Sequence, residues 1–322
     1  MKSILYAIPN VYDAISWYRG LGPLGRLRKQ MDISLTPLAH MNWTVASQHD
    51  ILYMLRPSTD DHKKILEMSK RLGLKVWVDY DDHLLDVPDS NPASDHYSNP
   101  RNKDNVRYCI AHADVVSVST EFLAKEFQQY RLGHPCVVIP NALHHRFSPL
   151  QEPNKIIMWR GSNTHEADLQ TAHPFFIKTQ DTHPDIKFVF FGDPDYRTKR
   201  IFKPGRMRVL PKVGIDEYFD TIKAIKPMFQ IVPLEDNPFN RAKSNIAWLE
   251  ATIAGAMTIA TPLPEWERKN AIFNDFDISA ALTLRNSYVE ASRAMTKDAL
   301  WIDNVNEIRK MIIETIDTIH LI

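Results

Sequence analysis

The densest group of side chains able to do chemistry is an acidic cluster that follows a short apolar run. Asp79, Asp81 and Asp82 come first, and His83 and Asp86 follow them. Like charges this close cost free energy unless solvent or a ligand compensates them. Asp79 and Asp81 are suited to hold a divalent metal on a nucleotide diphosphate, whereas one aspartate with His83 is suited to bind sugar hydroxyls or to move a proton. The structural alternative is a capped, solvated turn.

Arg160 and Gly161 stand where a second apolar run, residues 156–159, gives way to the start of a helix near Thr164. Free backbone N–H groups at a helix start attract anions, and a guanidinium adds a bidentate donor for phosphate. The segment therefore predicts an anion site that includes Arg160, Gly161 and Asn163. Simple helix capping is the structural alternative.

Lys243 and Ser244 precede another helix pattern, for which Ser244 is the predicted N-cap and Gly255 the end. The ammonium group of Lys243 adds a point charge beside the free N–H groups of that helix. Glu250 lies off the apolar stripe of the same helix, so its carboxylate is placed to accept both hydroxyls of a ribose. An exposed helix glutamate is the structural alternative.

Residues 18–27 combine three glycines with two arginines directly after the first predicted strand. Their spacing differs from the GxGxxG dinucleotide fingerprint, and Pro23 interrupts it. We interpret the segment either as a flexible loop or as a loop on the acceptor or phosphate side. In the second case Arg19 and Gly20 contact the ligand.

A basic segment places six cationic side chains within twelve residues. Such a run is commonly a solvated loop, but it also suits phosphate contacts with a polyanion. Its members are Arg197, Lys199, Arg200, Lys203, Arg206 and Arg208.

Short apolar runs alternate with helical patterns in two sets that meet near residue 150, and this alternation predicts parallel sheets with helices on both faces. Ligands of such sheets bind beyond the carboxyl ends of the strands, so the polar residues above are expected to meet in a cleft between two sheets. The predicted strands are residues 4–8, 51–55, 74–78, 115–118 and 137–139, then 156–159, 187–191, 207–210, 229–232 and 258–260; helices are predicted at 61–72, 121–130 and 245–254.

The last segment, residues 287–322, has the apolar spacing of a helix, with Val305, Ile308, Ile312, Ile316 and Ile319 on one stripe. We expect it to cover a core and to cross back to the first half.

Composition limits the class of protein. The chain has 322 residues, with 39 Lys and Arg against 39 Asp and Glu. Zero net charge excludes a general polyanion binder, and a hydrophobic content of 44% excludes a fully disordered chain. Two cysteines, no signal peptide and no apolar stretch of membrane-spanning length lead us to expect a cytoplasmic protein.

Residues 239–260 resemble the donor-binding segment of GT-B glycosyltransferases, and more narrowly of the retaining branch that uses nucleotide-sugars. The resemblance implies that Glu250 binds the donor ribose, and that Asn240, Lys243 and Ser244 lie at the diphosphate and sugar. It also implies that Arg160 and Gly161 contact the diphosphate. The matching residues are Phe239-Asn240, Lys243-Ser244, Glu250-Ala251, Gly255 and Ile259-Ala260.

Three further segments carry the resemblance. Those that end at Asp193 and surround Leu210 resemble the wall of the nucleoside pocket. The segment Asp79-Tyr80-Asp81-Asp82-His83-Leu84, followed by Pro88, Asn91 and Pro92, resembles a group of phage and bacterial members.

The chain also departs from the family. Ala242 stands where the family often has a second glutamate, eight residues before Glu250. The usual first-domain histidine is not obvious, so Asp81, Asp82 and His83 are the candidate catalytic residues.

We therefore expect an α/β protein with two Rossmann-like, doubly wound domains, residues 1–150 on the acceptor side and 151–300 on the donor side. A helix at 301–322 would return to the first domain. The expected reaction moves a hexose from a nucleotide-sugar, in first place a UDP-sugar, to a hydroxyl acceptor, with retention implied by the resemblance. No metal or other cofactor is expected, because Arg160, Lys243 and the helix starts neutralise the leaving diphosphate.

The acceptor and the class of activity stay open at this point. A hydroxymethylated base in phage DNA is one acceptor, and a glycan, a lipid-linked sugar, a protein or a small metabolite are others. One alternative function is a metal-dependent glycosyltransferase of the single-domain type that uses Asp79 and Asp81 on a glycan or small molecule. Another is a non-catalytic module that binds nucleotide-sugars or nucleic acid.

Overall fold

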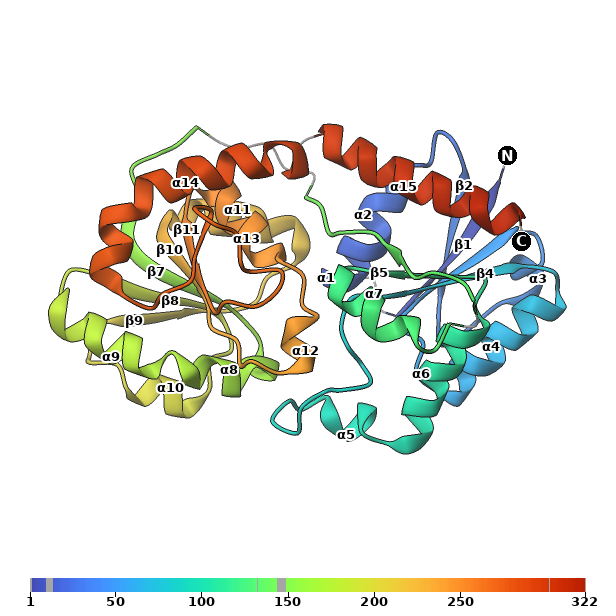
Figure 1. Cartoon of the computed structure of the whole chain (residues 1–322), viewed down its shortest axis with the longest axis horizontal. Coiled ribbons are helices and arrows are strands. Elements are labelled where there is room, and N and C mark those ends of the chain that lie inside the picture. Colours follow the sequence, from blue (N-terminus) through green and yellow to red (C-terminus); the bar gives the residue numbers. More distant parts are fainter. Residues whose placement is uncertain (1, 10–13, 132, 144–148, 301, 322) are drawn as a thin grey trace.

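The computed structural model describes residues 2–9, 14–131, 133–143, 149–300 and 302–321 of the chain. Among these residues the strands form two parallel sheets of six strands each, which lie next to one another along the long axis of the molecule (Figure 1). Each sheet has helices on both faces. The predicted pair of doubly wound α/β units is therefore confirmed.

The first sheet contains every strand predicted for it and one more. The additional strand is β2 at the edge of the sheet, whose half-exposed residues carry no apolar run. In sheet order the strands are β2 (Asp32–Pro37), β1 (Ser3–Ile8), β3 (Ile51–Leu55), β4 (Lys75–Tyr80), β5 (Val115–Val118) and β6 (Val137–Val138). The accompanying helices are α1 (Ala14–Ser16), η1 (Trp17–Leu21), α2 (Gly22–Gly25), α3 (Trp43–Ala46), α4 (Asp60–Arg71), α5 (Ser94–Tyr97), α6 (Pro100–His112) and α7 (Glu121–Gln128).

The second sheet also gains a short edge strand, β12, beyond the predicted ones. In sheet order its strands are β12 (Ile272–Phe273), β11 (Met257–Ala260), β10 (Pro227–Val232), β7 (Asn154–Gly161), β8 (Lys187–Gly192) and β9 (Met207–Leu210). Its helices are η2 (Asn163–His165), α8 (Glu166–Thr171), α9 (His173–Thr182), α10 (Tyr196–Arg200), α11 (Ile215–Ile225), α12 (Pro238–Arg241), α13 (Ile246–Ala254) and α14 (Ile278–Leu300), and α15 (Ile302–Leu321) follows.

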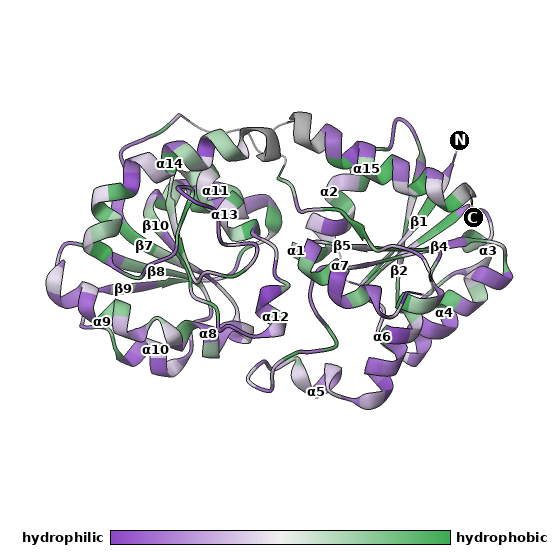
Figure 2. Cartoon of the chain, in the orientation of Figure 1, coloured by the Kyte–Doolittle hydropathy of each residue, from purple (hydrophilic) through white to green (hydrophobic). Residues whose placement is uncertain are grey.

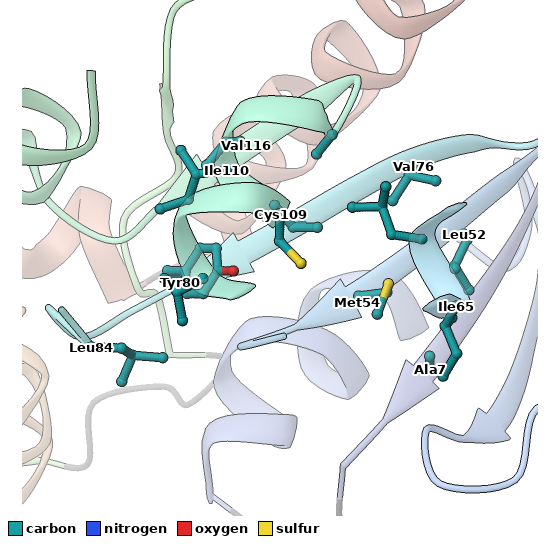
Figure 3. Close-up of a cluster of buried hydrophobic side chains, with 14 of the residues drawn as sticks. Ala7, Leu52, Met54, Ile65, Val76, Tyr80, Leu84, Cys109, Ile110 and Val116 are labelled. Atoms are coloured by element: carbon teal, nitrogen blue, oxygen red, sulfur yellow. The ribbon is translucent and has the colours of Figure 1, made fainter. Parts of the chain in front are cut away.

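Successive residues of β1 pack on opposite faces of the first sheet, as the period of a strand requires. Leu5 and Ala7 join one core cluster, shown in Figure 3, while Ile4 and Tyr6 join the other. Hydrophobic residues line the strands, and hydrophilic residues dominate the outward faces of helices such as α6 (Figure 2). None of the helices in the described residues is long and apolar enough to cross a membrane.

The C-terminal segment is two helices rather than the single one expected from residue 287. α14 packs on the second sheet, and α15 crosses back over the first (Figure 1). Ile308, Ile312, Ile316 and Ile319 of α15 join the core cluster of Tyr6, which confirms the predicted return to the first half. Residue 301 and the side chain of Val305 lie outside the described residues.

The glycine-rich segment at residues 18–27 is mostly helical, which corrects the expected loop. α1, η1 and α2 follow one another without a break, and η1 is a π-helix. A Cβ atom at Gly20 would overlap with the ring of Tyr6, so this glycine, predicted on the acceptor side, permits close packing against Tyr6. The predicted N-cap of α13 also shifts by one residue, because Asn245 rather than Ser244 precedes its first turn.

Candidate functional site

A cavity of about 610 Å³ lies between the two sheets, beyond the carboxyl ends of their strands. Both halves of the chain line it, since parallel strands bring the residues that follow them to one edge. Seven of the predicted site residues meet there, although they are as far apart in the sequence as residues 81 and 250. They are Asp81, Asp82, Arg160, Gly161, Lys243, Ser244 and Glu250.

Glu250 is the most enclosed carboxylate of the cavity, with only 2% of the residue exposed. The hydroxyl of Tyr18 donates to its Oε1 at 2.6 Å, and the hydroxyl of Tyr218 donates to its Oε2 at 2.9 Å. Arg160 Nε lies 2.7 Å from the same Oε2 as an ion pair. Burial, together with the charge of Glu250, raises the pKa of both tyrosines well above the usual value, so both phenols keep their protons and donate.

Arg56 organises the acidic side of the cavity and was absent from the sequence prediction. It follows β3 with a φ of 50°, a conformation that residues other than glycine seldom adopt and that often marks functional sites. Its guanidinium binds Asp81 through Nε and lies 2.5 Å from Asp82 Oδ2. Asp82 also faces Lys243 of the second half, whose Nζ is 3.4 Å from Oδ1.

The two aspartates respond differently to this environment. Burial raises the pKa of Asp81 because it outweighs the attraction of Arg56. Burial acts the same way on Asp82, but Lys243 and Arg56 together outweigh it and lower the pKa of Asp82 to about 2. Asp82 is therefore ionised at neutral pH, and its ion pair with Lys243 joins the two halves.

Asp79 and Arg19 form a buried pair away from the cavity, which corrects the acceptor-side role predicted for Arg19. Arg19 donates to both carboxylate oxygens of Asp79, at 2.8 and 2.7 Å, and to the carbonyl of Ile139 at 2.6 Å. Ser117 Oγ donates to Asp79 at 2.5 Å. Asp79 and Asp81 are thus satisfied by different guanidinium groups. No group of three or more His, Cys, Asp or Glu in the described residues is arranged to hold a metal.

His83 turns into the first-half core rather than into the cavity, so the structure corrects its catalytic assignment. Its ring packs edge-on against Phe127, with the ring centroids 5.6 Å apart, and its Nε2 lies 3.9 Å from Glu126. Burial lowers the pKa of its imidazole. Asp82 points the other way because adjacent side chains leave the strand end in different directions.

Four predicted donor-binding residues also lie outside the cavity lining. Asn163 is exposed, and Asp193 is an exposed partner of Lys212 at 2.7 Å. Leu210 packs in a small apolar cluster, and Asn240 is buried as a hydrogen-bond donor to Asp168. Near Asp193 and Leu210 the residues that line the cavity are Phe191, Lys212 and Val213.

Ala242, the position compared above with a second glutamate, is a packing residue. Its side chain is fully buried in the core cluster of the first sheet, and its carbonyl accepts a hydrogen bond from Thr120 at 3.0 Å. Asn141 Nδ2 donates to Ser244 Oγ at 2.8 Å beside it. The position is an interdomain packing contact, where a glutamate would bury an unpaired charge.

The basic segment lies apart from the site. None of its six side chains lines the cavity. Arg206 is buried and donates to the carbonyl of His183 at 2.8 Å, and Lys203 pairs with Asp181 at 2.6 Å. Four of the six remain exposed without an ion pair among the described residues, namely Arg197, Lys199, Arg200 and Arg208.

Sequence reasoning missed several residues that the cavity brings together. Tyr18, Arg56, Tyr97, His165 and Tyr218 all line it. Three of them had a signal in the sequence, since His165 lies in the segment that follows Arg160, Tyr18 opens the segment 18–27, and Arg56 directly follows a predicted strand. Tyr97 and Tyr218 had none and reach the site through contacts between segments far apart in the sequence.

No protein-family model and no curated protein sequence matches this chain, but many solved structures match its fold. Sucrose-phosphate synthase from Thermosynechococcus elongatus is similar at a TM-score of 0.69 and 10% identity, over 98% of this chain and 99% of that one. Anabaena Alr3699/HepE, solved with UDP and glucose, is similar at 0.65 and 12% identity, again over 98% and 99%.

Two other matches limit what the likeness in fold implies about the reaction. A protein of Listeria monocytogenes described as a UDP-N-acetylglucosamine 2-epimerase is similar at a TM-score of 0.61 and 11% identity, over 99% of this chain and 96% of that one. The pneumococcal O-GlcNAc transferase GtfA, solved with UDP and GlcNAc, is similar at 0.57 and 12% identity over 84% of this chain, which spans 56% of GtfA. The chain has the GT-B glycosyltransferase fold, as predicted, and this fold carries more than one reaction.

Proposed function

We propose that this chain, on its GT-B glycosyltransferase fold, transfers a hexose from a UDP-sugar to a hydroxyl acceptor. One observation carries the proposal: a buried carboxylate, Glu250, faces the interdomain cavity beside two cations, Arg160 and Lys243. A carboxylate is suited to accept two ribose hydroxyls, and two cations are suited to a diphosphate. The cavity volume of about 610 Å³ is in the usual range for small-molecule sites, roughly 300 to 1,000 Å³.

The proposed donor lies on the second half of the chain. Glu250 accepts the ribose hydroxyls in competition with Tyr18, one of the two tyrosines that donate to it, and Arg160 and Lys243 bind the diphosphate. Phe191 and Val213 supply apolar surface for the base. UDP is the proposed nucleotide because structures of this fold from Anabaena and pneumococcus hold it.

The proposed chemistry is electrostatic. As the bond between the sugar and the diphosphate breaks, its electron pair moves to the phosphate oxygen, and negative charge grows beside Arg160 and Lys243. Groups that bind this charge more strongly in the transition state lower the barrier selectively. Retention of configuration belongs to the proposal through the retaining branch that residues 239–260 resemble. The proposal needs no divalent metal.

The acceptor is proposed to enter along the first-half wall, where Asp81, Asp82 and Arg56 meet the ring of Tyr97. Carboxylates that accept hydrogen bonds from hydroxyl groups, beside an aromatic ring, are suited to bind a polyol such as a glycan or a small hydroxylated molecule. Transfer to a hydroxymethylated base in DNA is a separate prediction, in which the four exposed cationic side chains of the basic segment would contact the DNA phosphates. Binding to duplex DNA that weakens steeply with salt would support it, and no binding at low salt would exclude it.

Thermal shift and calorimetry with UDP, GDP, UDP-hexoses and GDP-hexoses test the donor assignment. We expect UDP and one UDP-hexose to stabilise the protein, and the double variant Lys243→Ala and Glu250→Ala to lose that effect. The absence of any nucleotide binding by the wild type would contradict the proposal. Incubation of the bound UDP-hexose with candidate acceptors then separates transfer from epimerisation and from binding alone, because only transfer yields UDP and a glycosylated product. An activity that EDTA abolishes and Mn²⁺ restores would contradict the metal-free chemistry.

A further inference from the structure

His165 stands beside the predicted anion-binding arginine and lines the same cavity. It ends η2, the single turn that follows β7, and its backbone N–H bonds to the carbonyl of Ser162 at 3.1 Å. The turn is held further by Ser162, whose hydroxyl lies 2.6 Å from that of Thr164. The backbone therefore presents the imidazole to the cavity from a fixed position.

The ring of His165 is oriented by a buried carboxylate behind it. Nδ1 lies 2.8 Å from Asp168 Oδ2, and Asp168 is 6% exposed. The other oxygen of Asp168 accepts from Asn240 Nδ2 at 2.7 Å and from the backbone N–H of Glu235 at 2.9 Å. Burial alone would raise the pKa of Asp168, but the hydrogen bonds from His165 and Glu235 lower it, so the carboxylate stays ionised.

An ionised acceptor at Nδ1 fixes the proton on that nitrogen and leaves Nε2 for a ligand. Nε2 of His165 has no hydrogen-bond partner in the part of the chain that the structure describes. Asn240, which the sequence assigned to the donor site, thus acts indirectly, because it donates to Asp168, whose carboxylate orients the imidazole of His165.

Four charged groups face this imidazole: Asp168 of α8, Arg160 of β7, Lys243 after α12, and Asp82 of the first half, whose own pKa His165 helps to lower. Burial lowers the pKa of His165, the cations Lys243 and Arg160 lower it further, and Asp168 only partly opposes them. The ring is therefore neutral near pH 7 while the cavity holds no anion.

We propose that His165 contacts the diphosphate of the donor through Nε2 and takes up a proton from solvent when the donor binds, with Asp168 as its positioning residue. The inference rests on the proposed function and adds to it a titrating contact. A diphosphate between Arg160, Lys243 and His165 cancels the repulsion that keeps the ring neutral and favours its cationic form. The protonated Nε2–H then donates to a phosphate oxygen, which is the stronger, charge-assisted kind of hydrogen bond.

The sign of the pH dependence follows from this linkage. Binding raises the pKa of His165, so the bound state holds more protons than the free state between the two values. Donor affinity is then greatest at low pH and falls as the pH rises through the value of the bound state. UDP-glucose suits the test because its diphosphate has no proton to gain or lose in this range. The terminal phosphate of UDP titrates at about pH 6, so UDP serves as a second probe of affinity and not of proton uptake.

Calorimetric titration in buffers of different ionisation enthalpy counts the protons taken up with each ligand molecule. We expect the wild type to take up a large fraction of one proton per UDP-glucose near pH 7. His165→Gln should take up almost none, bind about tenfold more weakly at pH 6, and bind almost as the wild type does at pH 8.5. Asp168→Asn should keep binding, but with less uptake and with the fall in affinity moved to lower pH.

His173→Gln is the matched control, because His173 is also half-buried in the second half but bonds Thr198 at 2.9 Å away from the cavity. It should leave both affinity and proton uptake unchanged. Binding by the wild type without proton uptake, or unchanged uptake in a folded His165→Gln, overturns the inference while the proposed function stands. Failure of the wild type to bind either probe contradicts the proposed function itself. If His165→Gln does not fold, the uptake and pH profile of the wild type and of Asp168→Asn still decide.

Discussion

The hydroxyl group of Tyr18 in the first half donates a 2.6 Å hydrogen bond to Glu250 in the second half. The bond joins the two halves at the cavity, which both residues line, and engages one oxygen of the carboxylate that we assign to the donor ribose. Tyr18 belongs to η1, a π-helical turn, and such turns often occur at functional sites. A ribose hydroxyl that donates to the same carboxylate oxygen competes with the hydroxyl of Tyr18 for Glu250.

Tyr18→Phe should bind UDP more tightly than the wild type, by about three- to tenfold, because the competing hydrogen bond is lost before the ligand enters. The same change should lower the free energy of unfolding by about 1 to 3 kcal/mol, since Tyr18 now donates to a charged group. Isothermal calorimetry and urea unfolding measure the two effects. Tyr53→Phe, which removes a buried 2.8 Å hydrogen bond to the Arg19 carbonyl, is the control for a general loss of stability. Weaker binding of UDP by Tyr18→Phe would show that Tyr18 supports the ligand.

Glu250→Gln should lower the affinity for UDP and for uridine alike, by about tenfold or more, because both ligands carry the ribose. Lys243→Met should lower the affinity for UDP but leave the affinity for uridine almost unchanged, because only UDP has a diphosphate. The comparison of the two ligands in each variant separates a ribose contact from a phosphate contact. Glu217→Gln, at an exposed position of α11, is the control. Equal loss of both ligands in Lys243→Met would contradict its assignment.

Asp82 should contribute to stability in acid. Its pKa is about 2 in the folded protein and near 3.8 when unperturbed. A carboxyl group with a lowered pKa stabilises the fold above its unfolded value and loses that contribution as the pH falls through the folded value. We expect the free energy of unfolding of the wild type to fall between pH 5 and pH 2 by about 2 kcal/mol more than that of Asp82→Asn. Parallel pH profiles for the two proteins in urea unfolding would contradict this.

Ala242→Glu should destabilise the protein by about 3 kcal/mol or more, because the side chain would enter a core cluster without a partner for its charge. Urea unfolding measures the loss. Ala294→Glu, at an exposed position of α14, should change stability little. A stable Ala242→Glu protein would mean that the two halves part easily at this contact, and that the family glutamate is absent for another reason.

Local patterns in the sequence were enough for much of the fold. The alternation of apolar runs and helical spacing predicted both sheets, and the stripe at Ile308, Ile312, Ile316 and Ile319 predicted the returning helix. Helix and strand periods are set by neighbours within a few residues, so they can be read without the tertiary structure. The same holds for the strand ends, where Asp82 and Arg160 line the cavity.

Which polar side chains face one another was decided only by the tertiary structure. Asp82 and His83 are adjacent in the sequence, yet one faces Lys243 and the other enters the core. The guanidinium of Arg19 was suited to bind an anionic ligand, but it donates both of its hydrogen bonds on that side to the carboxylate of Asp79. The direction and partner of a side chain depend on the residue opposite, and that residue is set by packing between segments far apart in the chain. Spacing thus indicated where the site lies, whereas the contacts of Tyr18 and Tyr218 with Glu250, and of Arg56 with the two aspartates, were decided by long-range packing.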